Sequence, residues 1–271
     1  MTAPPLHHDT LKKQAQSLAL HGVLAHWEDL NEDDLHRLHT WLHWETEVRQ
    51  RRSLERRLAN ARLGQFKSLA DFDWAWPKHI DKGAVSALMQ LSFVPEASNV
   101  VLVGPNGVGK STLAKNLAYQ AILQGYTVRF TSASHMLNDL AAQPSDNALR
   151  RRLKHYTHPD ILAIDEVGYL SYSDSHADLL FEIISRRYEQ KSTLVTTNRP
   201  FAEWGAVFPN APCVVSLVDR LVHHAEIIVI EGDSYRMKEA KERAAKRQGE
   251  TPKRSGVKSK PTNTEATEAR V

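Results

Sequence analysis

The stretch "LVGPNGVGKSTLAKNLA", residues 102–118, decides the fold of this chain. The apolar residues before Gly104 are typical of a strand, and the apolar spacing after Lys110 is typical of a helix. Between them, Gly104, Gly109, Lys110 and Ser111 satisfy the pattern G-x-x-x-x-G-K-[ST]. The stretch therefore predicts a strand, a glycine-rich loop and a helix N-terminus in succession.

Such a loop suits a triphosphate, which is a dense cluster of negative oxygens. Glycines allow positive φ angles and close approach of the backbone, so several N–H groups can converge on one point. The N-terminus of the following helix adds free N–H groups and a favourable dipole. Lys110 can reach the β- and γ-phosphates, and the Ser111 hydroxyl can ligate Mg²⁺. We expect the loop to bind ATP through Gly104, Pro105, Asn106, Gly107, Val108, Gly109, Lys110, Ser111 and Thr112.

Two adjacent acids lie in "DILAIDEVGYL", residues 160–170. Four apolar residues precede Asp165 and Glu166 and place them at the carboxyl end of a buried strand, where ligands gather in open α/β sheets. Asp165 suits the Mg²⁺ shell, through a water molecule, and Glu166 can polarise the water that attacks the γ-phosphate. The pair predicts an ATP hydrolase, because a small-molecule kinase would instead need a recognisable acceptor pocket.

The middle of the chain alternates strands with helical patterns. The segments at 99–104, 127–132, 160–165, 192–198 and 227–232 are short, and four of them are nearly continuous in apolar or β-branched residues, as in a parallel sheet buried on both faces. Helical patterns at 111–125 and 175–191 supply crossover connections. The arrangement predicts a doubly wound α/β domain.

Two polar side chains follow the nucleotide segments in sequence. Asn198 ends the strand "STLVTTN", where an amide can hydrogen-bond both the γ-phosphate and the attacking water, although Asn is also a common turn residue. Arg220 lies in "SLVDRLVHHA", and an arginine supplied by a neighbouring subunit stabilises transition-state charge in many oligomeric ATPases. Arg186 and Arg187 compete with Arg220 for that role.

The chain divides into three parts by composition. We expect a helical N-terminal domain at 1–67, in which Asn31 and Asp34 form a helix cap, an ATPase domain at 68–240 and a disordered polar tail at 241–271. No apolar run approaches the roughly 20 residues of a membrane span, and the N-terminus does not resemble a secretory signal. With Cys213 as its single cysteine, the chain suits a reducing cytoplasm.

Basic residues cluster in two places before the tail. Arg49, Arg52 and Arg56 share one face of a predicted helix, and "LRRRLK" at 149–154 contains Arg150, Arg151 and Lys154. The net charge of +3 does not argue for nucleic acid, because from Lys238 onward the chain has ten Lys and Arg against five Glu. The two clusters predict contacts with the DNA backbone, and solvated helix faces with acidic partners are the alternative.

The order of "GPNGVGKS", "ILAIDE", "TLVTTNRPF", "DRLVHHA" and "GDSYR" resembles the IstB-type transposition helper ATPases, relatives of the DnaC-type helicase loaders within AAA+. The resemblance implies a P-loop AAA+ core with a 5-1-4-3-2 parallel sheet and no helical lid. It also implies ATP-dependent self-assembly on duplex DNA, deformation of that DNA and delivery of it to a transposase. Asn198 would be the first sensor, Arg220 the arginine finger, and residues 80–85 would lie near the adenine. A DnaC-like loader of a replicative helicase is the alternative.

Overall fold

A computed structural model describes residues 8–169, 173–208 and 212–249. Its centre is a sheet of five parallel strands in the order β2-β3-β4-β1-β5. This order confirms the predicted 5-1-4-3-2 sheet. The strands are β1 (Asn99–Val103), β2 (Val128–Ser132), β3 (Ile161–Val167), β4 (Ser192–Thr197) and β5 (Ala225–Val229).

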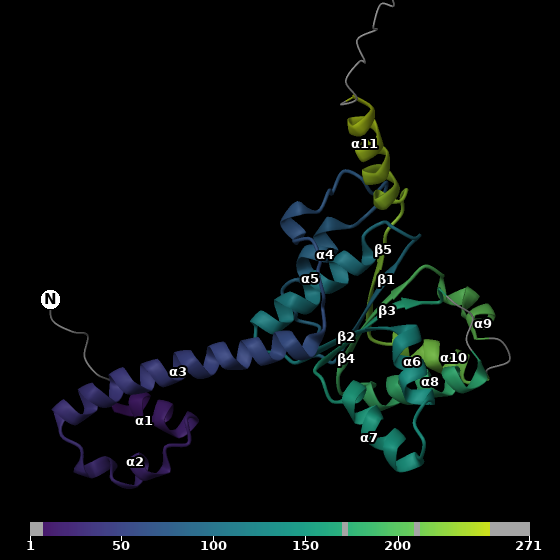
Figure 1. Ribbon diagram of the computed structural model, residues 1–271. Coiled ribbons are helices and arrows are strands. Elements are labelled where there is room, and N and C mark those ends of the chain that lie inside the picture. The colour runs from purple at the N-terminus through teal and green to yellow at the C-terminus, as the bar shows by residue number, and fades with distance from the viewer. Residues whose placement is uncertain (1–7, 170–172, 209–211, 250–271) are drawn as a thin grey trace, which may run out of the picture.

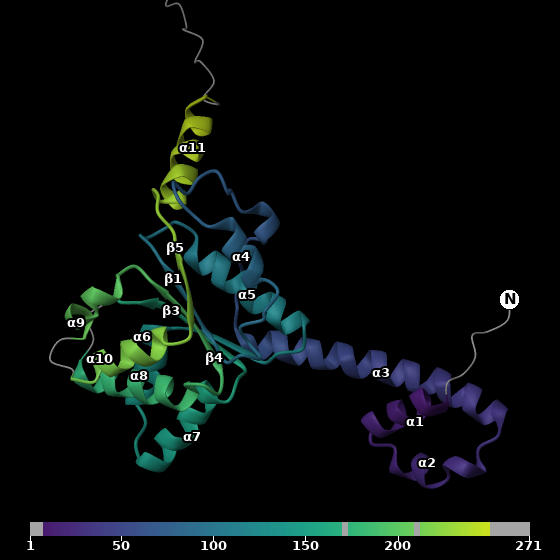
Figure 2. The same cartoon turned by 180° about the vertical axis from the view of Figure 1, so that it is seen from behind.

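Helices cover both faces of the sheet, as the continuous apolar strands predict (Figures 1 and 2). Successive strand residues alternate between two apolar cores, so Val101 packs on one face and Val100 and Leu102 on the other. The core on the Val100 face includes α4 (Lys82–Leu88) and α5 (Lys110–Leu123). The core on the Val101 face includes α6 (Ala133–Ala141), α7 (Asp146–Thr157), α8 (Asp174–Arg187), α9 (Trp204–Val207) and α10 (Val214–Val222).

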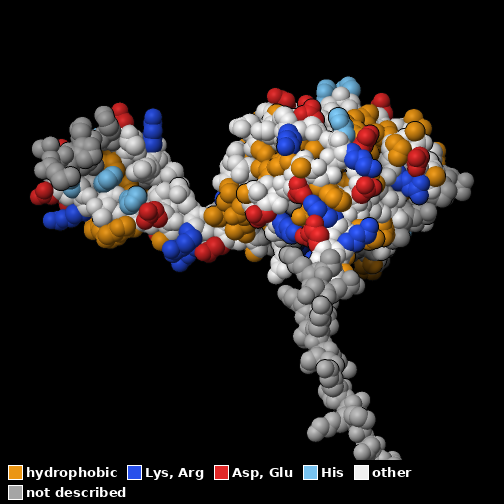
Figure 3. Space-filling model, turned by 90° about the horizontal axis from the view of Figure 1, so that it is seen from above, with side chains coloured by type: hydrophobic (Ala, Val, Ile, Leu, Met, Phe, Trp, Pro, Cys, Tyr) orange, Lys and Arg blue, Asp and Glu red, His pale blue; other side chains and the backbone are white. Residues whose placement is uncertain are grey.

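The N-terminal helices build a separate small core. They are α1 (His8–Ser17), α2 (His21–Ala25) and the 30-residue α3 (Glu32–Ala61), with a 3₁₀ turn at Trp27–Asp29. The expected cap of α3 is present, because Asn31 and Asp34 form a reciprocal capping box. Leu35, Leu38 and Leu42 pack against α1, whereas the other end of α3 packs on the sheet domain. Helix α3 thus joins two lobes, which Figure 1 and Figure 3 show from different sides.

The chain after β5 consists of one helix, α11 (Tyr235–Gly249), in the part that the structure describes. This agrees with a core that lacks a multi-helix lid. Helix α11 continues past residue 241, where the disordered tail was expected to begin. Strong helix formers and the ion pairs Lys238–Glu242 and Glu239–Arg243, each spaced i,i+4, account for the extension. Residues 250–271 of the predicted tail lie outside the described residues.

Among the described helices, none combines the length and the apolar character that a membrane span requires.

Candidate nucleotide-binding site

A cavity of about 370 Å³ lies at the carboxyl ends of β1, β3 and β4. The predicted loop forms its floor through Asn106 to Thr112, and Glu166 and Asn198 also line it. The opposite wall comes from the segment between α3 and α4 and from the start of α11. The structure therefore brings most of the predicted nucleotide residues to one cavity, although they come from three separate segments of the chain.

The backbone of the loop depends on its glycines. Gly109 has a φ of 104° and is the N-cap residue of α5, so its conformation strains any residue with a side chain. A Cβ added at Gly104 would lie 2.2 Å from the carbonyl oxygen of Ile230. The loop is thus fixed against the strand end behind it, and the first N–H groups of α5 lie at the cavity.

Lys110 is buried at the base of this loop. Its Nζ donates hydrogen bonds to the carbonyl oxygens of Gly104 at 2.7 Å and Pro105 at 2.8 Å. Burial lowers the pKa of Lys110, and the nearby carboxylates of Asp165 and Glu166 oppose this shift. The ammonium group is therefore held beside the loop by neutral acceptors, with negative charge close by, in the position where a cation can bind phosphate oxygens.

The two predicted acids lie at a β-bulge. The register between β3 and β4 shifts between Ile164 and Val167, so Asp165 and Glu166 together lie opposite Thr196. The Thr196 hydroxyl donates to Asp165 Oδ1 and accepts the Glu166 backbone N–H at 2.9 Å. Glu166 has a φ of 63°, which is strained for a residue with a side chain. The bulge turns Glu166 into the cavity, and sequence analysis did not identify Thr196 as the residue that holds it.

Asp165 and Ser111 form an oxygen-rich pair. The Ser111 hydroxyl donates to Asp165 Oδ1 at 2.9 Å, which joins the start of α5 to the end of β3. Carboxylate and hydroxyl oxygens are ligands that Mg²⁺ accepts, and Mg²⁺ usually keeps several waters as well. The two side chains therefore supply the kinds of oxygen atom that the predicted Mg²⁺ site requires.

Asn198 supplies a free acceptor to the same cavity. Its Oδ1 atom is buried and has no hydrogen-bond partner among the described residues. Buried polar atoms in native proteins are normally paired, so an unpaired one calls for an explanation. An amide oxygen that is free to accept a hydrogen bond from a water molecule fits the predicted sensor role of Asn198 better than the role of a turn residue.

The predicted arginine finger lies outside the cavity. Arg220, on α10, packs with its guanidinium 4.7 Å from the centre of the Phe181 ring and donates to the Ser185 hydroxyl. Arg220 does not line the cavity of its own chain. Arg186 is half-exposed and pairs with Glu182 of the same helix.

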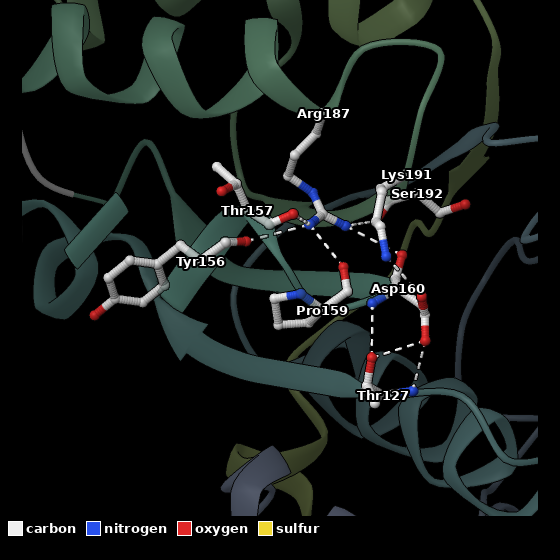
Figure 4. Close-up of polar contacts among 8 residues, drawn as sticks. All are labelled: Thr127, Tyr156, Thr157, Pro159, Asp160, Arg187, Lys191 and Ser192. Atoms are coloured by element: carbon white, nitrogen blue, oxygen red, sulfur yellow. Dashed lines mark hydrogen bonds and ion pairs between the residues drawn. The ribbon is translucent and has the colours of Figure 1, made fainter. Parts of the chain in front are cut away.

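Arg187 lies inside the protein and is 1% exposed. Its guanidinium donates to carbonyl oxygens of Tyr156, Thr157, Pro159, Asp160 and Ser192 and to the Thr193 hydroxyl, most of them drawn in Figure 4. Burial lowers the pKa of Arg187 to about 9, which still leaves it protonated at neutral pH. Because its donors are bonded within its own chain, Arg187 connects α8 to α7 and β4. It is therefore not free to reach a neighbouring subunit.

The aromatic wall of the cavity was not predicted. Phe66, Phe72, Trp76 and Tyr235 line it, whereas Ile80 and Val85, expected near the adenine, pack in the core beside α5. Residues 80–85 do not line the cavity, and their place near the adenine stays a prediction. The concentration of aromatic residues between 66 and 76 is the sequence signal that could have identified this wall.

Helix α11 is attached to the segment that carries the wall. Lys238 pairs with Asp73 at 2.9 Å and lies 4.5 Å from the centre of the Trp76 ring. The Trp76 indole donates to the Asp233 carbonyl oxygen at 2.8 Å, and Lys67 pairs with Glu239. These contacts bring residues from both ends of the ATPase domain to one side of the cavity.

The predicted DNA residues lie on two separate helices. On α3, Arg52 and Arg56 are exposed, whereas Arg49 pairs with Glu45 and donates to the Leu18 carbonyl oxygen. On α7 the exposed members of the cluster are Arg150, Arg151 and Lys154. Charges of both signs are mixed over the face that Figure 3 shows, so only such local clusters can attract a polyanion.

Comparison with known proteins assigns the family. Residues 9–244 match the family of IstB-like ATP binding proteins. The chain is 37% identical over 204 residues to an ATP-binding protein of insertion sequence IS21 from Pseudomonas aeruginosa, covering 75% of this chain and 77% of that protein. It is 33% identical over 191 residues to an ATP-binding protein of insertion sequence IS5376 from Geobacillus stearothermophilus, covering 70% and 76%. Among solved structures, the crystal structure of DnaI matches 62% of this chain and 89% of its own, with 20% identity and a TM-score of 0.49. The family match spans most of the sequence and includes the loop, the bulge and the cavity, and the chain therefore belongs to the IstB-like ATP-binding protein family.

Proposed function

We propose that this chain is an Mg²⁺-dependent ATP hydrolase that assembles on duplex DNA when it binds ATP and regulates transposition. In this proposal the assembly deforms the target DNA and recruits a transposase. The observation that carries the proposal is the convergence of Lys110, Ser111, Glu166 and the unpaired amide of Asn198 on one cavity. Such a set can bind a triphosphate and activate a water molecule beside it.

Binding rests on the loop and the aromatic wall. The N–H groups at the start of α5 donate to phosphate oxygens, and Lys110 exchanges its carbonyl partners for phosphate oxygens. Phe72 and Trp76 offer ring surfaces to the base. Ser111 would ligate Mg²⁺ directly and Asp165 through a water molecule, and the ion would neutralise phosphate charge.

Hydrolysis rests on the bulge. Glu166 accepts a proton from the attacking water, and the Asn198 amide oxygen accepts a hydrogen bond from the same water and orients it. Thr196 contacts neither the attacking water nor the phosphate in this proposal, but its hydrogen bonds fix the backbone that positions Glu166. In this proposal Arg220 completes the site of a neighbouring subunit, and its position outside the cavity of its own chain is compatible with that role. Hydrolysis therefore depends on assembly, and loss of the γ-phosphate releases the subunits.

The names of the relatives support a role in transposition. The insertion-sequence proteins described above are mobile-element proteins by name, and this favours transposition over helicase loading. The exposed arginines of α3 and α7 supply contacts to the DNA backbone. The half-exposed Trp41 and Trp44 on α3 form a surface on which the transposase docks.

The proposal is tested by ATP turnover and DNA capture. Glu166→Gln should bind ATP normally and lower the turnover rate by about 100-fold or more, since a general base contributes that much. The matched control is Glu182→Gln, the same change at an exposed carboxylate of α8. Lys110→Ala should bind neither ATP nor long duplex DNA, and normal assembly of this variant on DNA would contradict an ATP-controlled switch.

A further inference from the structure

Arg129 is a buried cation with few partners. It lies on β2, an edge strand of the sheet, and is 4% exposed. Its Nη1 donates to the carbonyl oxygen of Asn60 in the last turn of α3 at 3.1 Å, whereas its Nε has no partner within the described chain. Among the described residues no carboxylate forms an ion pair with it. The last turn of a helix carries only about half a negative charge, so this contact leaves Arg129 incompletely compensated.

His155, at the end of α7, is a second side chain with an unpaired buried nitrogen. Its Nε2 atom is buried and also has no hydrogen-bond partner among the described residues. Burial lowers the pKa of His155, and the positive charges of Arg129, Arg152 and Arg62 lower it further. The carboxylate that opposes them is Asp139, and it already accepts hydrogen bonds from Arg152 and from the Tyr156 hydroxyl.

An open cavity adjoins this cluster. It has a volume of about 370 Å³ and is lined by Gln143, Ala148, Arg151, Arg152 and His155. Arg62, the exposed residue that ends α3, follows Asn60, whose carbonyl oxygen accepts the hydrogen bond from Arg129, by two residues. The end of α3 packs on β2, and α7 lies next to this junction in both ribbon views (Figures 1 and 2).

Buried charges and buried donors both cost free energy unless they are paired. In this cluster positive charge exceeds negative charge. Two nitrogen atoms, Arg129 Nε and His155 Nε2, have no hydrogen-bond partner among the described residues, and a cavity lies beside His155. An anion with several acceptor oxygens would satisfy these groups together. A phosphate group has that form, and arginine is the side chain that recognises it best.

We propose that Arg62, Arg129, Arg151 and His155 form a binding site for a backbone phosphate of duplex DNA, where α3, β2 and α7 meet. This inference rests on the proposed function, because it specifies where the DNA runs. The exposed arginines Arg52 and Arg56 lie on α3 before Arg62, and the exposed Arg150 and Lys154 lie next to Arg151 and His155 on α7. Duplex DNA presents phosphates in a continuous row, so a site between two basic helices fits a backbone better than it fits a single free anion.

The test is the salt dependence of DNA binding by the full chain with a non-hydrolysable ATP analogue. The logarithm of the binding constant falls with the logarithm of salt concentration by about 0.9 for each phosphate contact. Arg62→Ala and Arg151→Ala should each reduce this slope by about one per protomer, equally for DNA of different sequences. When salt is raised from about 50 to about 200 mM, the affinity of the wild type for DNA falls. The affinity of each variant should fall about threefold less, per protomer, than that of the wild type.

Arg37→Ala is the matched control, because Arg37 is exposed on the opposite end of α3 and belongs to neither cluster. His155→Gln keeps a neutral donor and removes the ring, so it should weaken binding; its melting temperature is measured as well, because the ring packs against Tyr156. Unchanged slopes in the Arg62 and Arg151 variants would overturn this site and leave the ATP-dependent assembly intact. A wild type that does not bind duplex DNA with the analogue would refute the proposed function as well.

Discussion

Replacing Arg187 by methionine tests whether this arginine stabilises its own subunit or acts on another one. Methionine has a similar length and no hydrogen-bond donor. The change leaves five carbonyl oxygens and the Thr193 hydroxyl without their shared partner, in a place where the side chain is 1% exposed (Figure 4). These acceptors lie at the end of α7, in the segment before β3 and at the beginning of β4, so these parts of the chain lose their common anchor on α8.

The expected loss is large. At about 1.5 kcal/mol for each hydrogen bond to a charged group, six bonds would sum to about 9 kcal/mol, which approaches the whole stability of a typical domain. Such contributions are not additive, because the freed acceptors relax toward water. Removing one partner from a buried charged network typically costs about 3–5 kcal/mol. At roughly 3 °C per kcal/mol for a domain of this size, we expect the melting temperature to fall by about 10 °C.

Thermal unfolding followed by circular dichroism measures this loss. Arg186→Ala is the matched control, since Arg186 forms an exposed pair with Glu182 and should contribute less than about 1 kcal/mol. ATP turnover is measured below the melting temperature of both variants. An Arg187→Met protein with the wild-type melting temperature and no ATP turnover would refute the structural role and make this residue a candidate for the finger.

Three further substitutions test the nucleotide site. Arg220→Ala should bind ATP and lose about 1,000-fold in turnover, and mixing it with Glu166→Gln should restore activity, because the latter still binds ATP, assembles and supplies the finger in trans; no rescue would contradict a trans role. Thr196→Val should lower turnover with little change in ATP affinity and destabilise the fold by about 2 kcal/mol in urea unfolding, since it removes both hydrogen bonds at the bulge. Trp76→Ala should weaken ATP binding about tenfold in calorimetry, against Trp44→Ala as a control at an exposed tryptophan of α3; equal affinities would remove the aromatic wall from the base-binding surface.

The phosphate loop could be predicted because its chemistry is local. Residues 104–111 specify backbone conformation, helix start and ligand charge within a few positions, and the structure brings them to one cavity with Glu166 and Asn198. The strand order also came out as expected, although it followed from the family resemblance rather than from any pattern in the strands.

The remaining parts of the site depend on contacts between distant segments. Thr196 lies 30 residues from Glu166, and nothing in "IDEV" marks the bulge that its hydroxyl holds. The aromatic wall combines residues near 70 with Tyr235. The burial of Arg187, in contrast, could have been predicted from the sequence. Arg187 follows the buried Leu180, Ile183 and Ile184 at helical spacing, whereas its neighbour Arg186 lies off that face.

The nucleotide cavity and the proposed phosphate site are joined by a short stretch of chain. Arg62 ends α3 beside Arg129 and His155, and only four residues later Phe66 lines the nucleotide cavity. Asn116, on the helix that starts at the phosphate loop, holds the segment that follows Phe66: its amide donates to the Lys67 carbonyl oxygen at 3.0 Å and accepts the Leu69 N–H at 2.9 Å. If the proposed nucleotide displaces the aromatic wall, this short segment would transmit the displacement to the end of α3. Such a connection would couple the two proposed sites: a change at the nucleotide cavity would alter the contact with DNA where α3, β2 and α7 meet.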